Sequence, residues 1–464
     1  MSRLVVVSNR VTPITSRQVS SAGGLAVGVH AALRETGGVW FGWSGDTPAE
    51  PADEPRVFRT GKVTYGLIDI KDTDFEAFYG GFSNRTLWPL FHHRIDLTSF
   101  EHQWYATYRR VNRRFAELLL PLLEDDDVIW IHDYQLIPMA AELRRMGVKG
   151  RIGFFLHIPF PAPDIYVTLP WHRQLAVDLC AHDVVGFQTG GDLRQFQLYL
   201  ESEVGGRIGA DGAIAAFGRE LKAGAYPIGI DVDDVISMAR SPEAKRQADR
   251  VKATLPGGRK LMIGVDRLDY TKGILERLRA FEKMLQDYPS QRRGVVMLQI
   301  SAPSREDVPE YLDMRQQVEL MTGHLNGAYS ESDWVPLRYI NRSFSRRALT
   351  GFFRMSALCL VTPLRDGMNL VAEEFVAAQD EADPGVLVLS RFAGCAGIID
   401  GALIVNPYDT HHMADTLHAG LEMPIEERRE RWQRMMRTVR RHDIDAWRDR
   451  FLADLKIRPV ATIH

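Results

Sequence analysis

Short, continuous apolar runs alternate with helical stretches along most of this chain, and this alternation constrains the fold more than any other feature. In the first half the runs lie at residues 4–8, 128–131, 152–156, 184–187 and 225–228. In the second half they lie at residues 261–265, 295–300, 334–339, 358–361, 386–389 and 403–405. A continuous apolar run is typical of a strand covered on both faces. Strands that alternate with helices predict an α/β fold with two doubly wound, Rossmann-like parallel sheets.

The length and one polar segment predict how the chain divides. At ~100–200 residues per domain, a chain of 464 residues suggests two domains. Residues 231–258 are polar, charged and helix-prone, so we place the boundary near Val235. The predicted domains are residues 1–235 and 236–443, and residues 444–464 form a last helical segment.

Composition and charge exclude several classes of protein. The net charge of -3 argues against a non-specific nucleic-acid binder, which needs a basic surface. No apolar stretch reaches the ~18–20 residues that span a bilayer, and the first apolar run is too short for a signal peptide. Cys180, Cys359 and Cys395 are far apart among apolar or small residues, which predicts buried thiols in a reducing compartment. We therefore expect a cytoplasmic protein that binds neither nucleic acid nor membrane.

The ends of the predicted strands carry the candidate functional residues. Ligands of doubly wound sheets bind at the carboxyl ends of the strands, and two consecutive sheets place a cleft between them. These ends are rich in Arg, Asp and His: Arg10, His132, Asp133, His157, Arg267, Ser304, Arg305 and Asp366.

The pattern of residues 361–374 predicts the end of a strand, a turn and the start of a helix. Gly367 permits a tight turn, and Asp366 or Asn369 can cap the new helix. The first amides of that helix, near Leu370 and Val371, have no partners inside it and favour an anion such as a phosphate.

A carboxylate one turn into the same helix, Glu373 or Glu374, can accept hydrogen bonds from the hydroxyls of a ribose. Backbone amides that bind a diphosphate, together with a carboxylate that binds a sugar, are what a nucleotide-sugar site requires. The alternative is a capped surface helix with two solvated glutamates.

Two cations stand on the loop at residues 265–273, between a predicted strand and a predicted helix. Arg267 and Lys272 suit a diphosphate, although the alternative is a surface network with Asp266 or Asp269. Arg305 and Arg10, at two other strand ends, can hold a second phosphate from the opposite wall.

Sugar-binding candidates come from the first half of the chain. Asp133 and His157 end neighbouring strands, and a histidine beside a sugar can bond a hydroxyl. Tyr79 and Trp88 lie in residues 78–89, which have little strand or helix character, and aromatic residues on loops suit sugar faces. The alternatives are a satisfied core histidine and a packed aromatic cluster.

Several motifs are absent. The sequence holds no G-x-G-x-x-G for a nicotinamide dinucleotide and no zinc-binding set of Cys and His. The acidic run at residues 125–127 precedes a strand, at the end opposite the expected cleft, and we interpret it as a solvated turn. We therefore predict neither a metal nor a cofactor.

Taken together, seven motifs resemble the trehalose-6-phosphate synthases, a family of retaining glycosyltransferases, over essentially the whole chain. They are VSNR at 7–10, SAGG at 21–24, WFGWSG at 40–45, IWIHDY at 129–134, HIPFP at 157–161, VDRLDYTKG at 265–273 and TPLRDGMNL at 362–370. The resemblance implies two Rossmann-like domains facing across a cleft (GT-B). It also implies transfer of glucose from UDP-glucose to glucose 6-phosphate, with retention and without a metal, in trehalose biosynthesis.

The resemblance assigns roles position by position. The residues that match the donor site are Gly23, Gly24, Arg267, Lys272, Phe344, Asp366, Leu370, Val371, Ala372, Glu373 and Glu374. Those that match the acceptor site are Arg10, Tyr79, Trp88, Asp133 and Arg305, and those that match catalytic residues are His157, Asp133, Arg267 and Lys272. Trp88 and Ile158 match positions that select the anomer. Ile398 departs from the family, which usually carries an acidic residue there.

The resemblance also implies a homo-oligomer, dimer or tetramer, and a last helical segment that returns to the first domain. Two other functions stay open. One is a related transferase with another acceptor, such as a glucosylglycerol-phosphate synthase or a cyclitol-coupling homologue. The other is a non-catalytic regulatory subunit.

Overall fold

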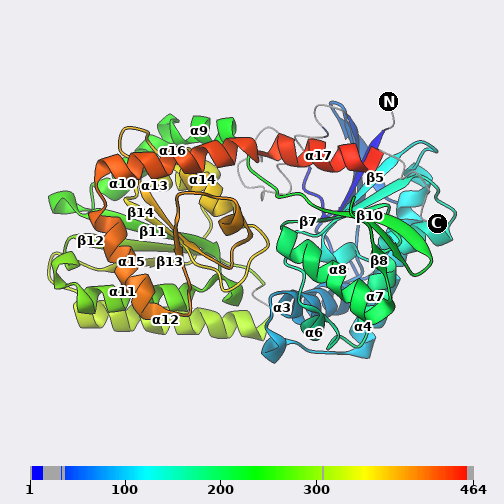
Figure 1. The fold of residues 1–464 in the computed structure, drawn as a ribbon, viewed down its shortest axis with the longest axis horizontal. Coiled ribbons are helices and arrows are strands. Elements are labelled where there is room, and N and C mark those ends of the chain that lie inside the picture. The colour runs from blue at the N-terminus through cyan, green and yellow to red at the C-terminus, as the bar shows by residue number, and fades with distance from the viewer. Residues whose placement is uncertain (1–2, 14–32, 34–36, 306–307, 457–464) are drawn as a thin grey trace. The chain divides into compact units, whose positions relative to one another are not determined.

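The computed structural model describes residues 3–13, 33, 37–305 and 308–456. The chain forms two compact units, one from Met1–Ile228 with Asp445–His464 and one from Gly229–Ile444. Figure 1 shows the elements of each. The first unit ends at Ile228, earlier than the boundary predicted near Val235, because Val235 lies inside a helix of the second unit, α9 (Val232–Ala239). The SAGG motif at residues 21–24 lies outside the described residues.

The first unit is built on a ten-stranded sheet with the order β3-β4-β2-β1-β5-β6-β7-β10-β9-β8. Its strands are β1 (Leu4–Arg10), β2 (Gly38–Trp43), β3 (Arg56–Thr60), β4 (Val63–Ile68), β5 (Val128–His132), β6 (Arg151–Phe155), β7 (Val184–Phe187), β8 (Arg207–Ile208), β9 (Ala213–Ala216) and β10 (Arg219–Ala225). From β4 to β10 neighbouring strands are parallel, and the outer β3, β9 and β8 pair antiparallel. The strand predicted at 225–228 is wrong, since β10 ends at Ala225. Pro227 has no amide to continue the ladder.

Helices of the first unit cover this sheet. They are α2 (Asp72–Phe75), α3 (Trp88–Phe91), α4 (His102–Leu119), α5 (Met139–Arg145), α6 (Pro163–Tyr166), α7 (His172–Leu179), α8 (Gly190–Val204) and α17 (Ile444–Lys456). Residues 78–89, predicted to have little helix character, are in fact helical. They belong to the π-helix η2 (Glu76–Leu87) and to α3, so Tyr79 and Trp88 do not stand on a loop.

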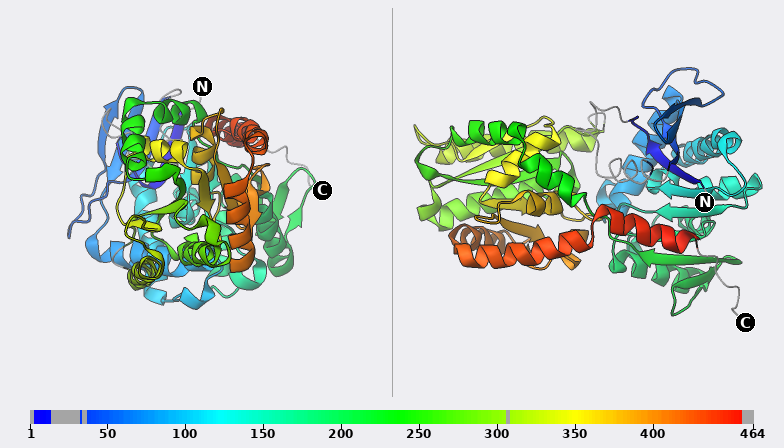
Figure 2. Two further views of the ribbon diagram at one scale, coloured as in Figure 1. Left: turned by 90° about the vertical axis from the view of Figure 1, so that its left-hand side faces the viewer. Right: turned by 90° about the horizontal axis from the view of Figure 1, so that it is seen from above.

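The last helix, α17, packs on the strands of the first unit (Figure 2). The ring of Trp447 lies 4.8 Å from that of Trp130 in β5. Gly153 and Gly186 make room for this helix, since a Cβ at either would come within 2.9 Å of the Phe451 ring. The C-terminal segment therefore lies with the first unit, as the resemblance implied.

The second unit holds a six-stranded parallel sheet with the order β13-β12-β11-β14-β15-β16. Its strands are β11 (Lys260–Arg267), β12 (Val295–Ala302), β13 (Leu337–Ile340), β14 (Leu358–Val361), β15 (Val386–Ser390) and β16 (Leu403–Val405). The other helices, besides α9, are α10 (Pro242–Lys252), α11 (Ile274–Asp287), α12 (Pro309–Tyr329), α13 (Arg346–Met355), α14 (Leu370–Ala378), α15 (Thr410–Glu422) and α16 (Ile425–Arg441). In Figure 1, α11 and α12 lie on one side of this sheet and α9 and α10 on the other. The doubly wound parallel fold is confirmed.

Three further sequence predictions concern composition. The cysteines Cys180, Cys359 and Cys395 are buried and free, as predicted. No helix within the described ranges is long and apolar enough to cross a membrane. The acidic turn at 125–127 is only partly solvated. Asp127 is buried, and its carboxylate accepts from Arg3 Nε at 2.9 Å and Nη2 at 2.7 Å.

Candidate functional site

The loop after β11 carries two basic side chains, and several contacts fix its conformation. Arg267 is exposed at the end of the strand, and Lys272 closes the short helix η7 (Tyr270–Lys272). The Asp269 side chain caps that helix, because its Oδ1 accepts from the amide and hydroxyl of Thr271, each at 2.9 Å. Gly273 follows with φ 61°, and a Cβ there would lie 2.1 Å from Thr362 O. A glycine is therefore required where the loop enters α11 beside β14.

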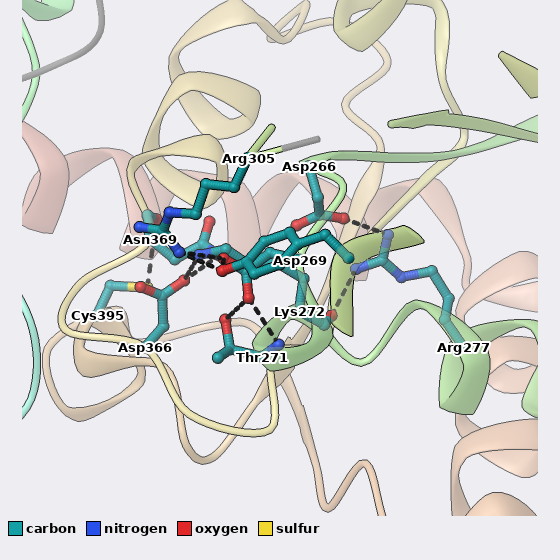
Figure 3. Close-up of polar contacts among 10 residues, drawn as sticks. Asp266, Asp269, Thr271, Lys272, Arg277, Arg305, Asp366, Asn369 and Cys395 are labelled. Carbon is teal, nitrogen blue, oxygen red and sulfur yellow. Dashed lines mark hydrogen bonds and ion pairs between the residues drawn. The ribbon is translucent and has the colours of Figure 1, made fainter. Parts of the chain in front are cut away.

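Lys272 reaches across to the turn after β14. Its Nζ lies 2.5 Å from Asp366 Oδ2, which also accepts from Asn369 Nδ2 at 2.9 Å (Figure 3). The Lys272 and Asp366 side chains are only 11% and 14% exposed. This arrangement fixes the ammonium group at the carboxyl end of the second sheet.

The turn before α14 differs from the prediction. The left-handed residue is Asn369, with φ 79°, and Gly367 is not among the residues with positive φ. Asn369 occupies the cap position, but no side-chain hydrogen bond caps α14, since the Asn369 amide is directed to Asp366 instead. The expected cap by Asp366 or Asn369 is therefore wrong. The N-terminal amides at Leu370 and Val371 receive no side-chain oxygen from either residue.

Asp269 also holds Arg305, which follows β12. Arg305 Nη1 lies 3.4 Å from Asp269 Oδ2 (Figure 3). The Tyr311 hydroxyl donates to the same oxygen at 3.1 Å, and Arg305 also bonds Tyr311. Burial raises the pKa of Asp269, but Arg305, Lys272 and Arg267 outweigh it and lower the pKa to about 2. One buried carboxylate thus stays ionised and ties Arg305 to the loop that bears Arg267 and Lys272.

A second buried ion pair supports the strand ends beneath this network. Arg277, wholly buried on α11, donates to Asp266 Oδ2 at 2.6 Å, Gln299 Oε1 at 2.8 Å and Thr362 Oγ1 at 3.0 Å. A Cβ on Gly264 would lie 2.3 Å from Arg277 Nη1. The guanidinium therefore links β11, β12 and the end of β14.

The other donor candidates of the second unit make separate contacts. Glu374 Oε1 lies 3.5 Å from Arg346 Nη2, and burial raises the Glu374 pKa more than Arg346 lowers it. Glu373 is 1% exposed, and burial together with Glu374 raises its pKa well above the ordinary range. The half-buried Phe344 packs on Phe352, with the Arg342 guanidinium 4.7 Å from its ring centroid.

In the first unit, Arg10 and Tyr79 meet around Trp43. The Arg10 guanidinium lies 5.5 Å from the Trp43 ring centroid, and the Tyr79 ring lies 6.3 Å from the same ring. Gly45, with φ 105°, leaves space for Arg10, since a Cβ there would come within 2.8 Å of Arg10 Nη2. Backbone and aromatic packing therefore position this guanidinium at the end of β1.

Asp133 and His157 are directly joined. The His157 amide donates to Asp133 Oδ1 at 3.2 Å, and His157 Nε2 lies 3.0 Å from His132 Nδ1. Burial lowers the pKa of His157 to about 3, and burial with the neighbouring His157 lowers that of His132 well below its ordinary value. Both rings are therefore neutral at physiological pH.

Trp88 and Ile158 are both buried, at 5% exposure each. The Trp88 ring lies 5.8 Å from that of Tyr134, the residue after Asp133, and His92 Nδ1 bonds Trp88 O at 2.7 Å. Trp88 thus belongs to the packed surroundings of Tyr134.

The structure brings seven of the predicted residues into three groups. Lys272, Asp366 and Arg305 share the network of the second unit, Asp133 and His157 are bonded, and Arg10 and Tyr79 share Trp43. Gly23 and Gly24 lie outside the described residues. The sequence assigned no ligand-binding role to Asp269, Tyr311 or Asn369, and it marked His132 only by its place at a strand end.

Non-glycine residues with positive φ mark parts of the candidate site that the sequence did not reveal. The described non-glycine residues with positive φ are His93, Asp133, Phe217, Arg293, Arg305 and Asn369. Three of them, Asp133, Arg305 and Asn369, stand in the groups just described. Such residues are uncommon, and they persist where the surrounding structure over-determines them, often at binding sites.

Among the described residues, no cluster of three or more His, Cys, Asp or Glu has the geometry to hold a metal ion. The acidic residues of the second-unit network are instead occupied by Lys272, Arg277 and Arg305.

Comparison with known proteins shows what the whole chain is similar to. The sequence model of glycosyltransferase family 20 matches residues 2–457. The chain is 49% identical over 458 residues to the trehalose-6-phosphate synthase of Sinorhizobium fredii, covering 98% of each chain. A crystal structure of an α,α-trehalose-phosphate synthase (UDP-forming) from Burkholderia xenovorans in complex with glucose-6-phosphate matches with TM-score 0.94 and 49% identity, covering 98% of this chain and 100% of that chain. An E. coli structure bound with UDP-2-fluoro glucose matches with TM-score 0.94 and 44% identity, covering 99% of this chain and 100% of that chain.

Proposed function

We propose, since the chain belongs to glycosyltransferase family 20, that it transfers glucose from UDP-glucose to glucose 6-phosphate with retention of configuration. The products are α,α-trehalose 6-phosphate and UDP. The observation that carries this proposal is 49% identity over 98% of both chains to a trehalose-6-phosphate synthase. Related structures hold glucose-6-phosphate and UDP-2-fluoro glucose, one ligand of each kind that the reaction needs.

The donor residues proposed here belong to the second unit. Arg267 and Lys272 hold the diphosphate as two fixed cations, and the amides at Leu370 and Val371 add the N-terminus of α14. Glu374 accepts from the ribose hydroxyls. Asp366 and Asn369 support this site, because their contacts keep the Lys272 ammonium at the strand end.

The acceptor residues proposed here include Arg10, Tyr79, Trp88 and Asp133 of the first unit, and Arg305 of the second. The two arginines, Tyr79 and Trp88 bind the phosphate, and Asp133 binds a sugar hydroxyl. Support comes from the fixed position of Arg10 beside Trp43 and of Arg305 beside Asp269.

Catalysis then depends on positioning and on charge. Negative charge grows on the departing diphosphate, and Arg267 and Lys272 stabilise it there. The leaving phosphate takes the proton of the acceptor hydroxyl, so the reaction needs no carboxylate nucleophile. His157 lies beside the donor sugar as a neutral ring, which its pKa of about 3 supports.

A panel of acceptors tests the proposal. Pure protein is incubated with UDP-glucose and, separately, glucose 6-phosphate, glycerol 3-phosphate and a cyclitol phosphate, and UDP release is measured. We expect release with glucose 6-phosphate. Release only with another acceptor indicates a related transferase, and release with none indicates a non-catalytic regulatory subunit.

Three other properties are part of the proposal. The reaction uses no metal, so activity should persist after treatment with EDTA. The protein acts in the cytoplasm, which the three buried free thiols support. It forms a homo-oligomer, which light scattering on the purified protein tests.

A further inference from the structure

Within the described part of the chain, the ring of His132 makes one hydrogen bond and is otherwise surrounded by aromatic rings. Its Nδ1 lies 3.0 Å from His157 Nε2, whereas its Nε2 is buried and has no hydrogen-bond partner among the described residues. The neighbouring rings are Trp130 at 4.5 Å, Phe155 at 6.4 Å and Trp447 of α17 at 6.1 Å. None of these rings offers an oxygen or a basic nitrogen to a donor.

This environment decides where the proton of His132 lies. A neutral imidazole carries one N–H, on either nitrogen. With the proton on Nε2, a buried N–H would have no acceptor, an arrangement that folded proteins avoid. With the proton on Nδ1, the N–H has an acceptor at 3.0 Å in His157 Nε2, and only a lone pair is left unpaired. The second arrangement is the favoured one.

The tautomer of His132 fixes that of His157 in turn. We propose that His132 is a positioning residue that donates from Nδ1 to His157 Nε2, so that His157 presents Nδ1–H as a hydrogen-bond donor. Its Nε2 lone pair is then occupied and its Nδ1 carries a proton, so the ring donates and does not act as a base. The low pKa of His157 keeps this ring neutral.

A second contact, from Asp133, helps to keep this donor in place. Asp133 accepts from the His157 amide at 3.2 Å, which fixes the backbone, and the His132 contact fixes the ring. His157 Nδ1 makes no hydrogen bond to any residue that the structure describes. The group that it addresses is an oxygen acceptor with no charge to neutralise, such as a sugar hydroxyl. That last step rests on the proposed function, whereas the two tautomers do not.

Another histidine of the first unit supplies an internal reference. His182 is buried, its Nδ1 lies 3.0 Å from Leu179 O, and its Nε2 has no partner among the described residues. A carbonyl oxygen only accepts, so His182 carries its proton on Nδ1. Nitrogen-15 NMR of the resting protein, labelled on histidine, should therefore show the same pattern for His132, His157 and His182, with Nδ1 protonated and Nε2 not. Protonation of Nε2 on His157 would overturn the proposal, whether or not the protein transfers glucose.

Substitutions at His132 distinguish the proposed hydrogen bond to His157 from a role in packing alone. An asparagine amide takes the place of Nδ1, a glutamine amide takes the place of Nε2, and phenylalanine keeps volume alone. We expect His132→Asn to keep kcat within about threefold, and His132→Gln and His132→Phe to lose about tenfold or more with little change in KM, as for a lost hydrogen bond. His182→Asn is the matched control and should leave kcat unchanged.

A purely structural role predicts the opposite order. Asparagine leaves the largest void, so His132→Asn would then be the most damaged variant in both melting temperature and kcat. That order, or equal losses in all three variants, would overturn the proposal. If none of the His132 variants folds, the tautomer pattern of the unsubstituted protein decides alone. Failure of glucose transfer in the unsubstituted protein would count against the proposed function and leave the tautomers to the NMR measurement.

Discussion

The cation network of the second unit is charged and paired, whereas the bonded histidines of the first unit are neutral. In the second unit Lys272 meets Asp366, and Arg305 meets an Asp269 whose pKa of about 2 keeps it ionised. In the first unit burial lowers the pKa of His157 to about 3, so its ring contributes hydrogen bonds without charge.

The difference matches the chemistry proposed for each ligand group. A diphosphate leaving group gains negative charge and is stabilised by cations that are already in place. A sugar hydroxyl carries no charge, and a neutral ring binds it without attracting a counter-ion. In the first unit, Arg10 beside Trp43 is the cation proposed to bind the acceptor phosphate.

The largest effect is expected at Lys272. Lys272→Ala should lower kcat by about 100- to 1,000-fold, the range for removing a group that stabilises a developing anion, and should change the KM for UDP-glucose much less. Steady-state kinetics in both substrates measures this. Lys283→Ala is the control, because Lys283 pairs with Asp287 at 2.8 Å on the neighbouring helix. Equal losses in turnover and donor affinity would contradict the assigned role.

Arg305→Ala should act on the acceptor. Losing a charge-assisted hydrogen bond to a phosphate should raise the KM for glucose 6-phosphate by about 10- to 100-fold and the KM for UDP-glucose far less. Arg292→Ala is a matched control, since Arg292 lies 5.5 Å from the Tyr329 ring and Arg305 lies 5.4 Å from that of Tyr311. An unchanged affinity for glucose 6-phosphate would show that Arg305 does not bind it.

Asp269 should make the fold sensitive to acid. Its folded pKa, about 2, lies below its ordinary value of 3.8, so its stabilising effect is complete above about pH 5 and is lost as the pH falls toward 2. Asp269→Asn should therefore remove about 2 kcal/mol of the difference in unfolding free energy between pH 6 and pH 2. Urea unfolding at both pH values measures this, with Asp287→Asn as the control. An unchanged pH dependence would mean that Asp269 is not ionised in the buried network.

The smallest effect is expected on the shape of the pH–activity profile when His157 is replaced. With its pKa at about 3, this ring does not change charge between pH 5.5 and 8.5. His157→Gln should lower kcat without changing the shape of the pH profile. An inflection near pH 6 belongs to the acceptor phosphate and is shared by both proteins. An inflection that disappears in the variant would show that the first unit uses a titrating histidine.

The sequence predicted the second sheet and strands β1, β5, β6 and β7 of the first, because buried parallel strands leave continuous apolar runs, but it missed β2, β3, β4, β8 and β9. It failed at residues 78–89, which were expected to have little strand or helix character and are helical. Gly81 is required inside η2, since a Cβ there would lie 2.6 Å from the Trp104 ring. The glycine is explained by a helix that lies later in the chain, which no local pattern reveals.

The same limit applies to the site. Arg267, Lys272 and Asp366 could be recognised because strand-end loops carry ligands. The roles of Asp269 and His132 depend on residues far along the chain: Arg305 and Tyr311 for the first, His157 and Trp447 for the second. The turn before α14 shows a smaller failure. Gly367 was expected to permit the tight turn, but the residue with positive φ is Asn369, whose amide is held by Asp366.

The most direct test of the whole account is the structure of the product. The protein is incubated with UDP-glucose and glucose 6-phosphate, and the sugar product is analysed by proton NMR alongside UDP release. We predict one UDP per trehalose 6-phosphate, with both anomeric protons in the α configuration. A β-linked product, or free glucose in place of a disaccharide phosphate, would contradict transfer with retention.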